Sequence, residues 1–353
     1  MRNNHGPITL FWVCFFFTII GVFLGGVIGW FETGSITGFL KYFFICCVLG
    51  ILEISLSFDN SIINARVLGR MEPLWRRRFL IWGILIAVFG MRIVFPLLVV
   101  VVAVGINPIA AVKLAIGEPH RYAEVLTDAH MGIAAFGGTF LMMVGLKYFF
   151  DSEKEVHWLK VIERFAQKLG AFAGIDIAIV LILILFVSGQ IVAEDKVTFL
   201  LAALYGLLTF IGVEAVSHLL DAPKKTLTTV AQGGLGAFLY LEVLDASFSF
   251  DGVVGAFAFS HNLFIIAIGL GIGAFYVRSM TIMLVESGTL LHYRYLEHGA
   301  FYAILVLAVI MYLQTIIPVP EVLTGLVGVC IIGMALYSSI RFKHRQLEKH
   351  VAS

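Results

Sequence analysis

The chain has 353 residues, of which 60% are hydrophobic and 13% are charged, and its mean hydropathy is +0.99. A water-soluble protein of this length could not bury so much apolar surface, so the composition excludes a soluble protein and predicts an all-α polytopic protein of the lipid bilayer. The net charge of +1 says nothing about partners, but the basic residues lie in short loops and form no continuous face, which predicts no nucleic-acid partner.

About ten segments are long and apolar enough to cross a bilayer. They are 8–30, 38–61, 78–104, 130–150, 171–190, 197–217, 232–258, 262–285, 299–317 and 321–340. When the lysines and arginines are counted in alternate loops, eighteen fall on one side and three on the other. Because basic loops stay in the cytoplasm, this distribution predicts that both termini are cytoplasmic.

The loop at 151–170 carries apolar residues at helical spacing, namely Val156, Leu159, Ile162 and Phe165. This pattern predicts an amphipathic helix that lies on the cytoplasmic surface of the membrane.

A short acidic motif occurs twice, each time inside a long apolar segment. The first copy is Glu53-Ile-Ser-Leu-Ser-Phe-Asp-Asn60 and the second is Asp245-Ala-Ser-Phe-Ser-Phe-Asp-Gly252. Each copy opens with an acid and carries an aspartate six residues later, Asp59 or Asp251. Ionisable side chains at membrane depth are costly, so they are candidates for a functional site. The duplication predicts a transporter built from two repeats.

The similarity between the halves extends beyond the motif. An arginine follows in the next helix of each half (Arg92 and Arg278), and a histidine lies at the start of the helix after that (His130 and His298). The two units begin five helices apart, which is an odd offset, so we expect two inverted three-helix repeats within a single transmembrane domain. The predicted parts are repeat 1 at 38–150, the cytoplasmic segment 151–170, connecting helices in 171–231, repeat 2 at 232–317, a final helix at 321–340 and a basic cytoplasmic tail at 341–353.

The geometry of a helix limits how the motif can work. Six residues along a straight helix leave Glu53 and Asp59 about 120° apart, so both can face one site only if the helix opens between them. Serine hydroxyls in the motif permit such a break by bonding to freed backbone groups. The motif then offers carboxylate, hydroxyl, amide and carbonyl oxygens, which favour Mn²⁺, Ca²⁺ or Mg²⁺ over softer metals.

The predicted metal ligands are Glu53, Asp59, Asn60, Asp245 and Asp251. Supporting or coupling roles are predicted for Ser57, Ser249, Glu242, Arg92, Arg278, His130 and His298. A purely structural alternative pairs Asp59 with Arg92 and Asp251 with Arg278, and it leaves the opening acids of both copies without partners.

The pattern Glu53-x-x-Leu56-Ser57-x-Asp59-Asn60 resembles the signature of the TerC (tellurium-resistance) family of integral membrane proteins, which is related to LysE-type exporters. The chain length and the Asp-Gly form of the second copy resemble the longer bacterial branch of that family. The resemblance implies export of divalent metal ions, chiefly manganese, across the bacterial inner membrane, with the motif acids lining the path. Asp245 and Gly252 depart from the pattern, and both positions bear on which ion is accepted.

The leading hypothesis is a secondary exporter of divalent cations, Mn²⁺ above all, that works by alternating access with protons as counter-ions. We expect no tightly bound cofactor, and no G-x-x-x-x-G-K-[ST] motif for nucleotide binding occurs. The alternatives are an amino-acid exporter of the LysE type and a non-transporting membrane scaffold in a stress response. An intramembrane hydrolase using Asp59 and Asp251 leaves the repeat unexplained, so we do not expect an enzyme.

Overall fold

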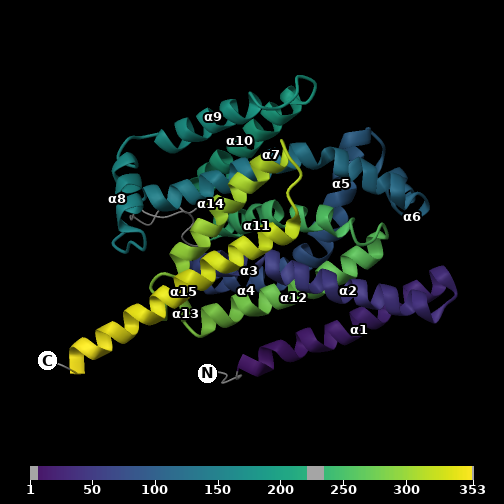
Figure 1. Cartoon of the computed structure of the whole chain (residues 1–353), viewed down its shortest axis with the longest axis horizontal. Helices are drawn as coiled ribbons and strands as arrows, with labels where there is room; N and C mark the ends of the chain where they lie inside the picture. The colour runs from purple at the N-terminus through teal and green to yellow at the C-terminus, as the bar shows by residue number, and fades with distance from the viewer. Residues whose placement is uncertain (1–6, 221–233, 352–353) are drawn as a thin grey trace. The chain divides into compact units, whose positions relative to one another are not determined.

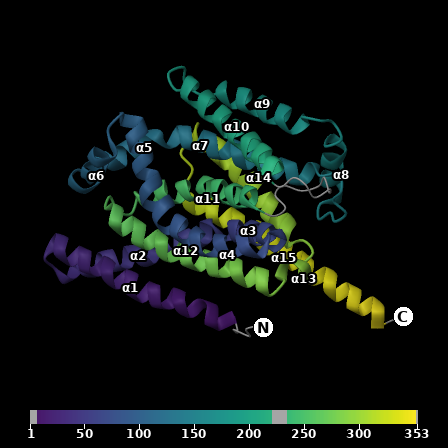
Figure 2. The same cartoon turned by 180° about the vertical axis from the view of Figure 1, so that it is seen from behind.

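The computed structural model describes residues 7–220 and 234–351, and within these ranges every regular element is a helix (Figures 1 and 2). The helices are α1 (Pro7–Thr33), α2 (Ile36–Leu56), α3 (Phe58–Arg70), α4 (Pro73–Leu85), the π-helix η1 (Ile86–Val94), α5 (Phe95–Val104), α6 (Pro108–Gly117), α7 (Pro119–Phe150), α8 (Lys160–Leu169), α9 (Ile175–Ser188), α10 (Lys196–Leu220), α11 (Leu235–Ala256), α12 (Leu263–Glu286), α13 (Thr289–His292), α14 (Leu296–Gln314) and α15 (Glu321–Val351).

Eight helical spans among the described residues are long and apolar enough to cross a membrane. They are Phe11–Thr33, Ile36–Leu56, Pro73–Val104, Pro119–Phe150, Lys196–Ser217, Leu263–Glu286, Leu296–Gln314 and Leu323–Gln346. The chain is therefore an all-helical, polytopic membrane protein, as its composition predicts.

Two of the ten predicted spans are not among the eight. The segment predicted at 171–190 forms α9, which has 14 residues and so a length of about 21 Å, less than the roughly 30 Å of the hydrocarbon core. The segment predicted at 232–258 forms α11, which has 22 residues but carries Glu242, Asp245 and Asp251. Both departures come from local features of the chain, namely helix length and acidic content.

The chain divides into two compact units. Unit 1 comprises Met1–Ser57, Arg76–His130 and Phe248–Met283, and unit 2 comprises Phe58–Trp75, Met131–Ser247 and Leu284–Ser353. Both copies of the acidic motif are cut by the boundary, the first after Ser57 and the second after Ser247. Each unit therefore contains part of each copy.

Unit 1 packs α1 and α2 against α12. The rings of Phe17 and Phe275 stack with their centroids 4.4 Å apart, and the side chains of Cys14 and Ser279 share a hydrogen bond of 3.0 Å. Gly273 brings α12 very close to α2, since a Cβ at this position would lie 2.4 Å from the Cβ of Glu53. Small residues permit such close helix packing inside a membrane protein.

Unit 2 packs the end of α7 against the start of α14. The rings of Tyr148 and Phe301 stack at 3.8 Å, and the guanidinium of Arg66 lies over both rings. Arg66 also forms an ion pair of 2.7 Å with Glu297. These contacts fix the end of α3, the helix on which the motif residues Asp59 and Asn60 lie.

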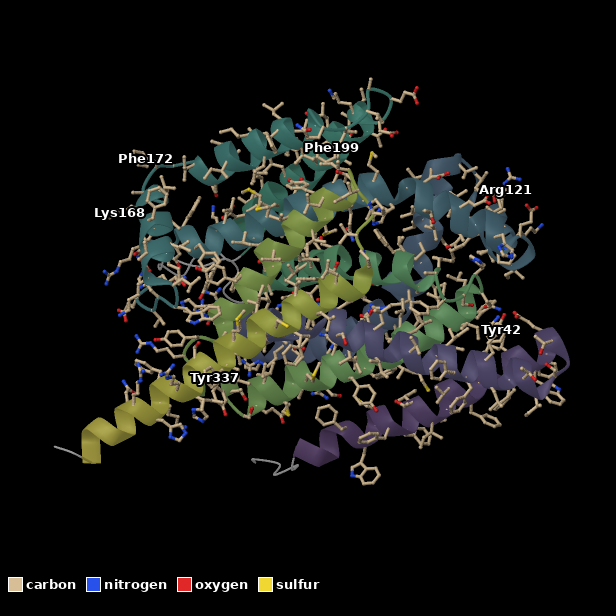
Figure 3. All side chains as sticks on the ribbon, viewed as in Figure 1. Tyr42, Arg121, Lys168, Phe172, Phe199 and Tyr337 are labelled. Carbon is tan, nitrogen blue, oxygen red and sulfur yellow. The ribbon has the colours of Figure 1, made fainter. Side chains whose placement is uncertain are left out.

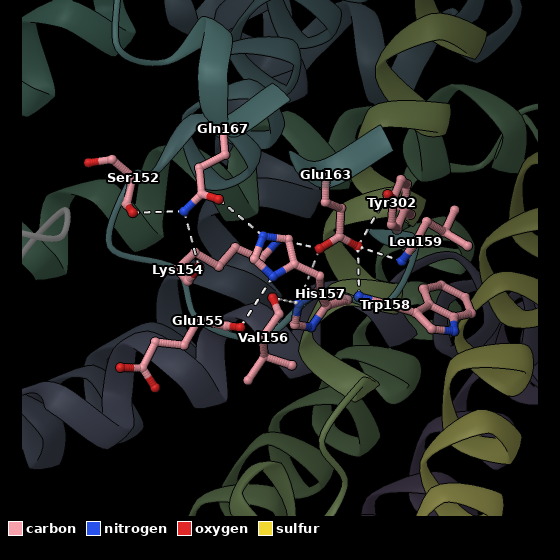
Figure 4. A network of polar contacts seen from close by, with 11 residues as sticks. Ser152, Lys154, Glu155, Val156, His157, Trp158, Leu159, Glu163, Gln167 and Tyr302 are labelled. Carbon is pink, nitrogen blue, oxygen red and sulfur yellow. Dashed lines mark hydrogen bonds and ion pairs between the residues drawn. The ribbon is translucent and has the colours of Figure 1, made fainter. Parts of the chain in front are cut away.

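The 151–170 segment differs from the single amphipathic helix predicted there. Its helix α8 begins only at Lys160, and the residues before it fold against Glu163 (Figure 4). One carboxylate oxygen of Glu163 accepts hydrogen bonds from the backbone N–H groups of Trp158 and Leu159 at 3.1 and 3.0 Å. The other pairs with the ammonium of Lys154 at 2.9 Å. Glu163 thereby caps the start of α8 with its side chain, which shortens the helix.

Only part of the predicted apolar face lies on the shorter helix, because Leu159 immediately precedes its first residue. Ile162 and Phe165 are 58% and 65% exposed, and Lys168 and Phe172 lie near the end of α8 (Figure 3). Val156, which was predicted to belong to this face, precedes the helix, and its carbonyl oxygen lies 2.8 Å from the ring nitrogen Nε2 of His298.

Candidate functional site

The helix that carries the first copy of the motif breaks inside it. The helix α2 ends at Leu56, Ser57 has φ −105° and ψ 14°, and α3 begins at Phe58. The hydroxyl of Ser57 donates a 2.9 Å hydrogen bond to Glu53 Oε1, so this serine both ends the helix and contacts the opening acid. The second copy lies within an unbroken helix, α11, where the hydroxyl of Ser247 bonds to the carbonyl of Val243.

Glu53 belongs to unit 1 and is only 1% exposed. Its Oε1 accepts hydrogen bonds from Ser57 and from Arg92, with which it forms a buried ion pair. Arg92 lies in the π-helix η1 and also donates to the carbonyl of Ala87, five residues earlier. Arg92 thus binds the opening acid Glu53, which the structural alternative had left unpaired.

Two glycines of unit 1 enclose the Glu53 carboxylate. A Cβ at Gly252, the last residue of the second motif copy, would lie 3.1 Å from Glu53 Oε2. Gly273 touches the aliphatic part of the same side chain. Because neither position has a side chain, backbone lies directly against the acid.

Asp245 belongs to unit 2 and has neutral partners. Its Oδ1 accepts hydrogen bonds from the side-chain amides of Asn60 and Asn64, both at 2.8 Å. The carbonyl oxygens Oδ1 of the same two asparagines are buried and have no hydrogen-bond partner among the described residues. The sequence analysis did not predict Asn64, although its place four residues after Asn60 puts both on one face of α3.

The remaining predicted ligands differ in how they are placed. Asp59 is 5% exposed in the first turn of α3, where its carboxylate accepts the backbone N–H of Asn60 at 3.0 Å. A negative charge is favourable at this end of a helix. Asp251 lies on α11, and its side chain is outside the described residues.

The predicted supporting residues are spread over both units. Ser249 is buried in unit 1, and Glu242 is half-buried in unit 2, one turn before Asp245. The guanidinium of Arg278 lies 4.0 Å from the ring centroid of Phe79, in a space that a side chain at Gly83 would fill. The predicted pairing of Arg278 with Asp251 falls on a side chain outside the described residues.

The two predicted histidines have different surroundings. His130 is half-buried on α7. His298 is buried at the start of α14, where its Nε2 lies 2.8 Å from the Val156 carbonyl and 3.5 Å from Glu163 Oε2. His298 is thus part of the network around Glu163.

The described residues contain no group of three or more His, Cys, Asp or Glu side chains that could together hold a metal ion. The oxygens of the motif are instead divided between an ion pair at Glu53 and an amide pair at Asp245. Among the described residues, neutral oxygen atoms beside a carboxylate are therefore the available cation ligands at the motif.

A family model described as "Protein of unknown function (DUF475)" matches residues 58–346, which is well over half of the chain. The chain belongs to this family. None of the curated proteins and none of the solved structures compared with it matches it significantly. The assignment to the TerC family, and with it the relationship to LysE-type exporters, is wrong. It depended on the pattern Glu53-x-x-Leu56-Ser57-x-Asp59-Asn60, on its second copy and on the chain length, and so short a pattern does not define a family among apolar helices.

Proposed function

We propose that this protein is a secondary transporter that exports divalent metal cations, with Mn²⁺ as its main ion, across the bacterial inner membrane. One observation carries the proposal: the opening acid of each motif copy lies beside the last residue of the other copy. In unit 2, Asn60 donates to Asp245, and in unit 1, a side chain at Gly252 would touch Glu53. Such crosswise contacts are expected when two inverted repeats meet about an axis in the membrane plane.

The division of the chain supports the same arrangement. The two proposed repeats, 38–150 and 232–317, each contribute segments to both units. The uneven distribution of lysine and arginine supports cytoplasmic termini. Under this proposal, transport proceeds by alternating access, and both copies of the motif serve one ion path.

The chemistry of the two acids suggests which of them lies near the bound cation. Glu53 is paired with Arg92, so this pair has no net charge. Among the described residues, Asp245 accepts hydrogen bonds from two neutral amide groups, so no cationic side chain competes with a metal ion for this acid. Protons compete with metal ions for such a carboxylate, so exchange for protons is the simplest form of coupling.

Flux through the reconstituted full chain tests the proposal. Liposomes containing a Mn²⁺-quenched dye should show Mn²⁺ movement that follows an imposed pH gradient, and Asp245→Asn should abolish it. Ser55→Ala is the matched control, because this motif hydroxyl donates to the Ile51 carbonyl of its own helix, and it should keep the wild-type rate. If wild-type liposomes move Mn²⁺, Ca²⁺ and Mg²⁺ no faster than empty ones, the transporter proposal is rejected.

A structural role for the motif is the second candidate, and the buried Glu53–Arg92 ion pair is the observation that favours it. In that case the acids hold the helices together, and the protein acts as a membrane scaffold. Cellular manganese content separates the two candidates. A transporter lowers manganese in a sensitive host and Asp245→Asn does not, whereas a scaffold leaves manganese unchanged in both at matched membrane levels.

A further inference from the structure

Two buried side-chain amides in unit 2 converge on a single carboxylate oxygen. Asn60 and Asn64 are four residues apart on α3 and are 5% and 2% exposed. The Nδ2 atom of each lies 2.8 Å from the same atom, Oδ1 of Asp245. Because both bonds end on one atom, the two amides lie side by side.

The orientation of both amides follows from the chemistry of their shared partner. An ionised carboxylate only accepts hydrogen bonds, so each asparagine must turn its N–H end towards Asp245. A flipped amide would instead bring its oxygen against the negative charge. Each carbonyl oxygen is consequently turned away from Asp245, and both are buried without a hydrogen-bond partner in the part of the chain that the structure describes.

Buried polar atoms in native proteins are nearly always bonded, and an exception calls for an ion or an ordered water. Two unpartnered oxygens on neighbouring turns of one helix form an oxygen-rich site of the kind that hard cations prefer. The nearby carboxylate supplies negative charge that a cation needs inside an apolar protein. A site with two neutral oxygens binds its ion less strongly than a set of carboxylates does. Weaker binding favours release of the ion on the other side of the membrane.

We infer that Asn60 and Asn64 bind the cation directly through their side-chain carbonyl oxygens, and that Asp245 is the positioning residue that turns both oxygens towards it. The inference rests on the proposed function and specifies its ligand atoms. It adds Asn64 to the site and gives Asp245 a different task from direct ligation.

The surroundings of Glu53 show why we place this site in unit 2. The position that matches Asn60 is Gly252, which has no side chain, and the acid beside it, Glu53, is bound by Arg92 and Ser57. No pair of amides faces Glu53 among the described residues of unit 1. We therefore expect one cation per chain at this site.

Infrared difference spectroscopy tests the ligand atoms directly. The full chain, in lipid nanodiscs, is labelled with ¹³C at the side-chain carbonyl of its six asparagines, and spectra are recorded with and without Mn²⁺. The labelled carbonyl band should shift on addition of Mn²⁺. Asn60→Leu and Asn64→Leu should each remove about half of this response and lower the Mn²⁺ affinity at least tenfold.

The control is Asn107→Asp, which removes a labelled amide but keeps an acceptor for the Ala110 N–H at the start of α6, and it should leave the response unchanged. Asp245→Asn tests the positioning role. It should move the labelled band even without Mn²⁺, because two N–H groups lose a charged acceptor, and lower the affinity about 10- to 100-fold, as for groups that orient metal ligands.

If a variant does not fold, the wild-type spectrum alone tests whether asparagine carbonyl oxygens bind Mn²⁺. If Mn²⁺ binds and is transported but the asparagine band does not move, the ligand assignment is overturned and the transport proposal survives. If the band moves but liposomes show no flux, the ligand assignment stands and transport is rejected. If Mn²⁺, Mg²⁺ and Ca²⁺ neither move the band nor cross the membrane, both proposals fall, and buried water occupies the two oxygens.

Discussion

The two copies of the acidic motif have similar sequences but place their opening acids in different surroundings. Glu53, in unit 1, is neutralised by Arg92 and enclosed by glycines. Asp245, in unit 2, is held by the neutral amides of Asn60 and Asn64. One acid therefore forms an ion pair, while the other is bound by two amides whose carbonyl oxygens have no hydrogen-bond partner among the described residues.

The comparison shows that Glu53 and Asp245, which occupy matching positions in the two copies, have different kinds of partner. A buried ion pair of this kind fixes the packing of helices, because either charge alone would be strongly unfavourable. A buried carboxylate among amides keeps the potential to attract a cation. The two copies differ in the residues that surround their opening acids, and four predictions test this difference.

The largest effect is expected from Glu53→Leu, which leaves the Arg92 guanidinium buried without its carboxylate. Breaking one partner of a buried pair should lower the free energy of unfolding by about 3–5 kcal/mol. The double variant Glu53→Leu, Arg92→Met should recover most of that loss, because no charge remains buried. Denaturation in detergent, followed by circular dichroism, measures both. A double variant no more stable than the single one would contradict the ion-pair assignment.

The next largest effect is expected from Gly252→Asn, which makes the second copy resemble the first. The new side chain would begin only 3.1 Å from Glu53 Oε2, so overpacking should cost about 1–3 kcal/mol. Gly328→Asn in α15, where a Cβ would have no neighbour within 4 Å, is the control for glycine replacement in a helix. Equal losses in the two variants would show that Glu53 has room for a partner from the second copy.

A smaller loss is expected from Asp245→Asn. The new amide oxygen can still accept one of the two asparagine N–H groups, so only the charge and one bond are lost, and stability should fall by about 1–2 kcal/mol. Chemical denaturation alongside Glu53→Gln measures the difference between the halves. If Asp245→Asn proves more destabilising than Glu53→Gln, Asp245 is the structural acid and the assignment of the two halves must be exchanged.

The smallest effect concerns Glu163, a buried acid outside both copies that serves as a reference. Burial alone would raise the pKa of its carboxyl, but hydrogen bonds from the Leu159 N–H and the Lys154 ammonium outweigh burial and hold the pKa below its ordinary value of 4.5. Because the pKa is lower in the folded state, ionised Glu163 adds stability that is complete above about pH 4.5 and is lost as the pH falls through the lower folded value.

Replacement of this carboxylate by an amide should remove that dependence on pH. Glu163→Gln should be about 1 kcal/mol less stable than the wild type at pH 7, and the gap should close below pH 4. Melting temperatures across this pH range provide the measurement, and Glu155→Gln, at a position whose backbone carbonyl rather than side chain contacts His157, is the control. A gap that stays constant with pH would show that Glu163 does not change its proton binding on folding.

The sequence predicted the membrane class and the helices because long apolar runs leave few other structures possible. It also indicated that Glu53 and Asp59 could share a site only if the helix opened between them, and Ser57 provides such a break. Ser249, the counterpart of Ser57 in the second copy, lies within the continuous helix α11, so the second copy has no such break. The same residue type thus ends one helix and continues another, and local pattern does not distinguish the two.

The sequence did not predict which residues bind the two opening acids. Arg92 reaches Glu53 from a π-helix, whose altered winding changes the direction of every side chain that follows. Asn64 lies 181 residues before Asp245, and nothing in its own surroundings marks it as a partner for that acid. Contacts between distant residues depend on how helices pack, which a single sequence does not show.

The long separation between Asn64 and Asp245 has a consequence for biosynthesis. Arg92 follows Glu53 by 39 residues, so at about 5–20 residues per second the ribosome supplies this partner within about 2–8 seconds. Asp245 follows Asn64 by 181 residues and is made about 9–36 seconds later. Asn60 and Asn64 are therefore synthesised well before their acceptor, and many intervening helices are inserted in the meantime. A chain truncated before α11 would still contain both residues of the Glu53–Arg92 ion pair. It would lack Asp245, the acceptor of the hydrogen bonds from Asn60 and Asn64.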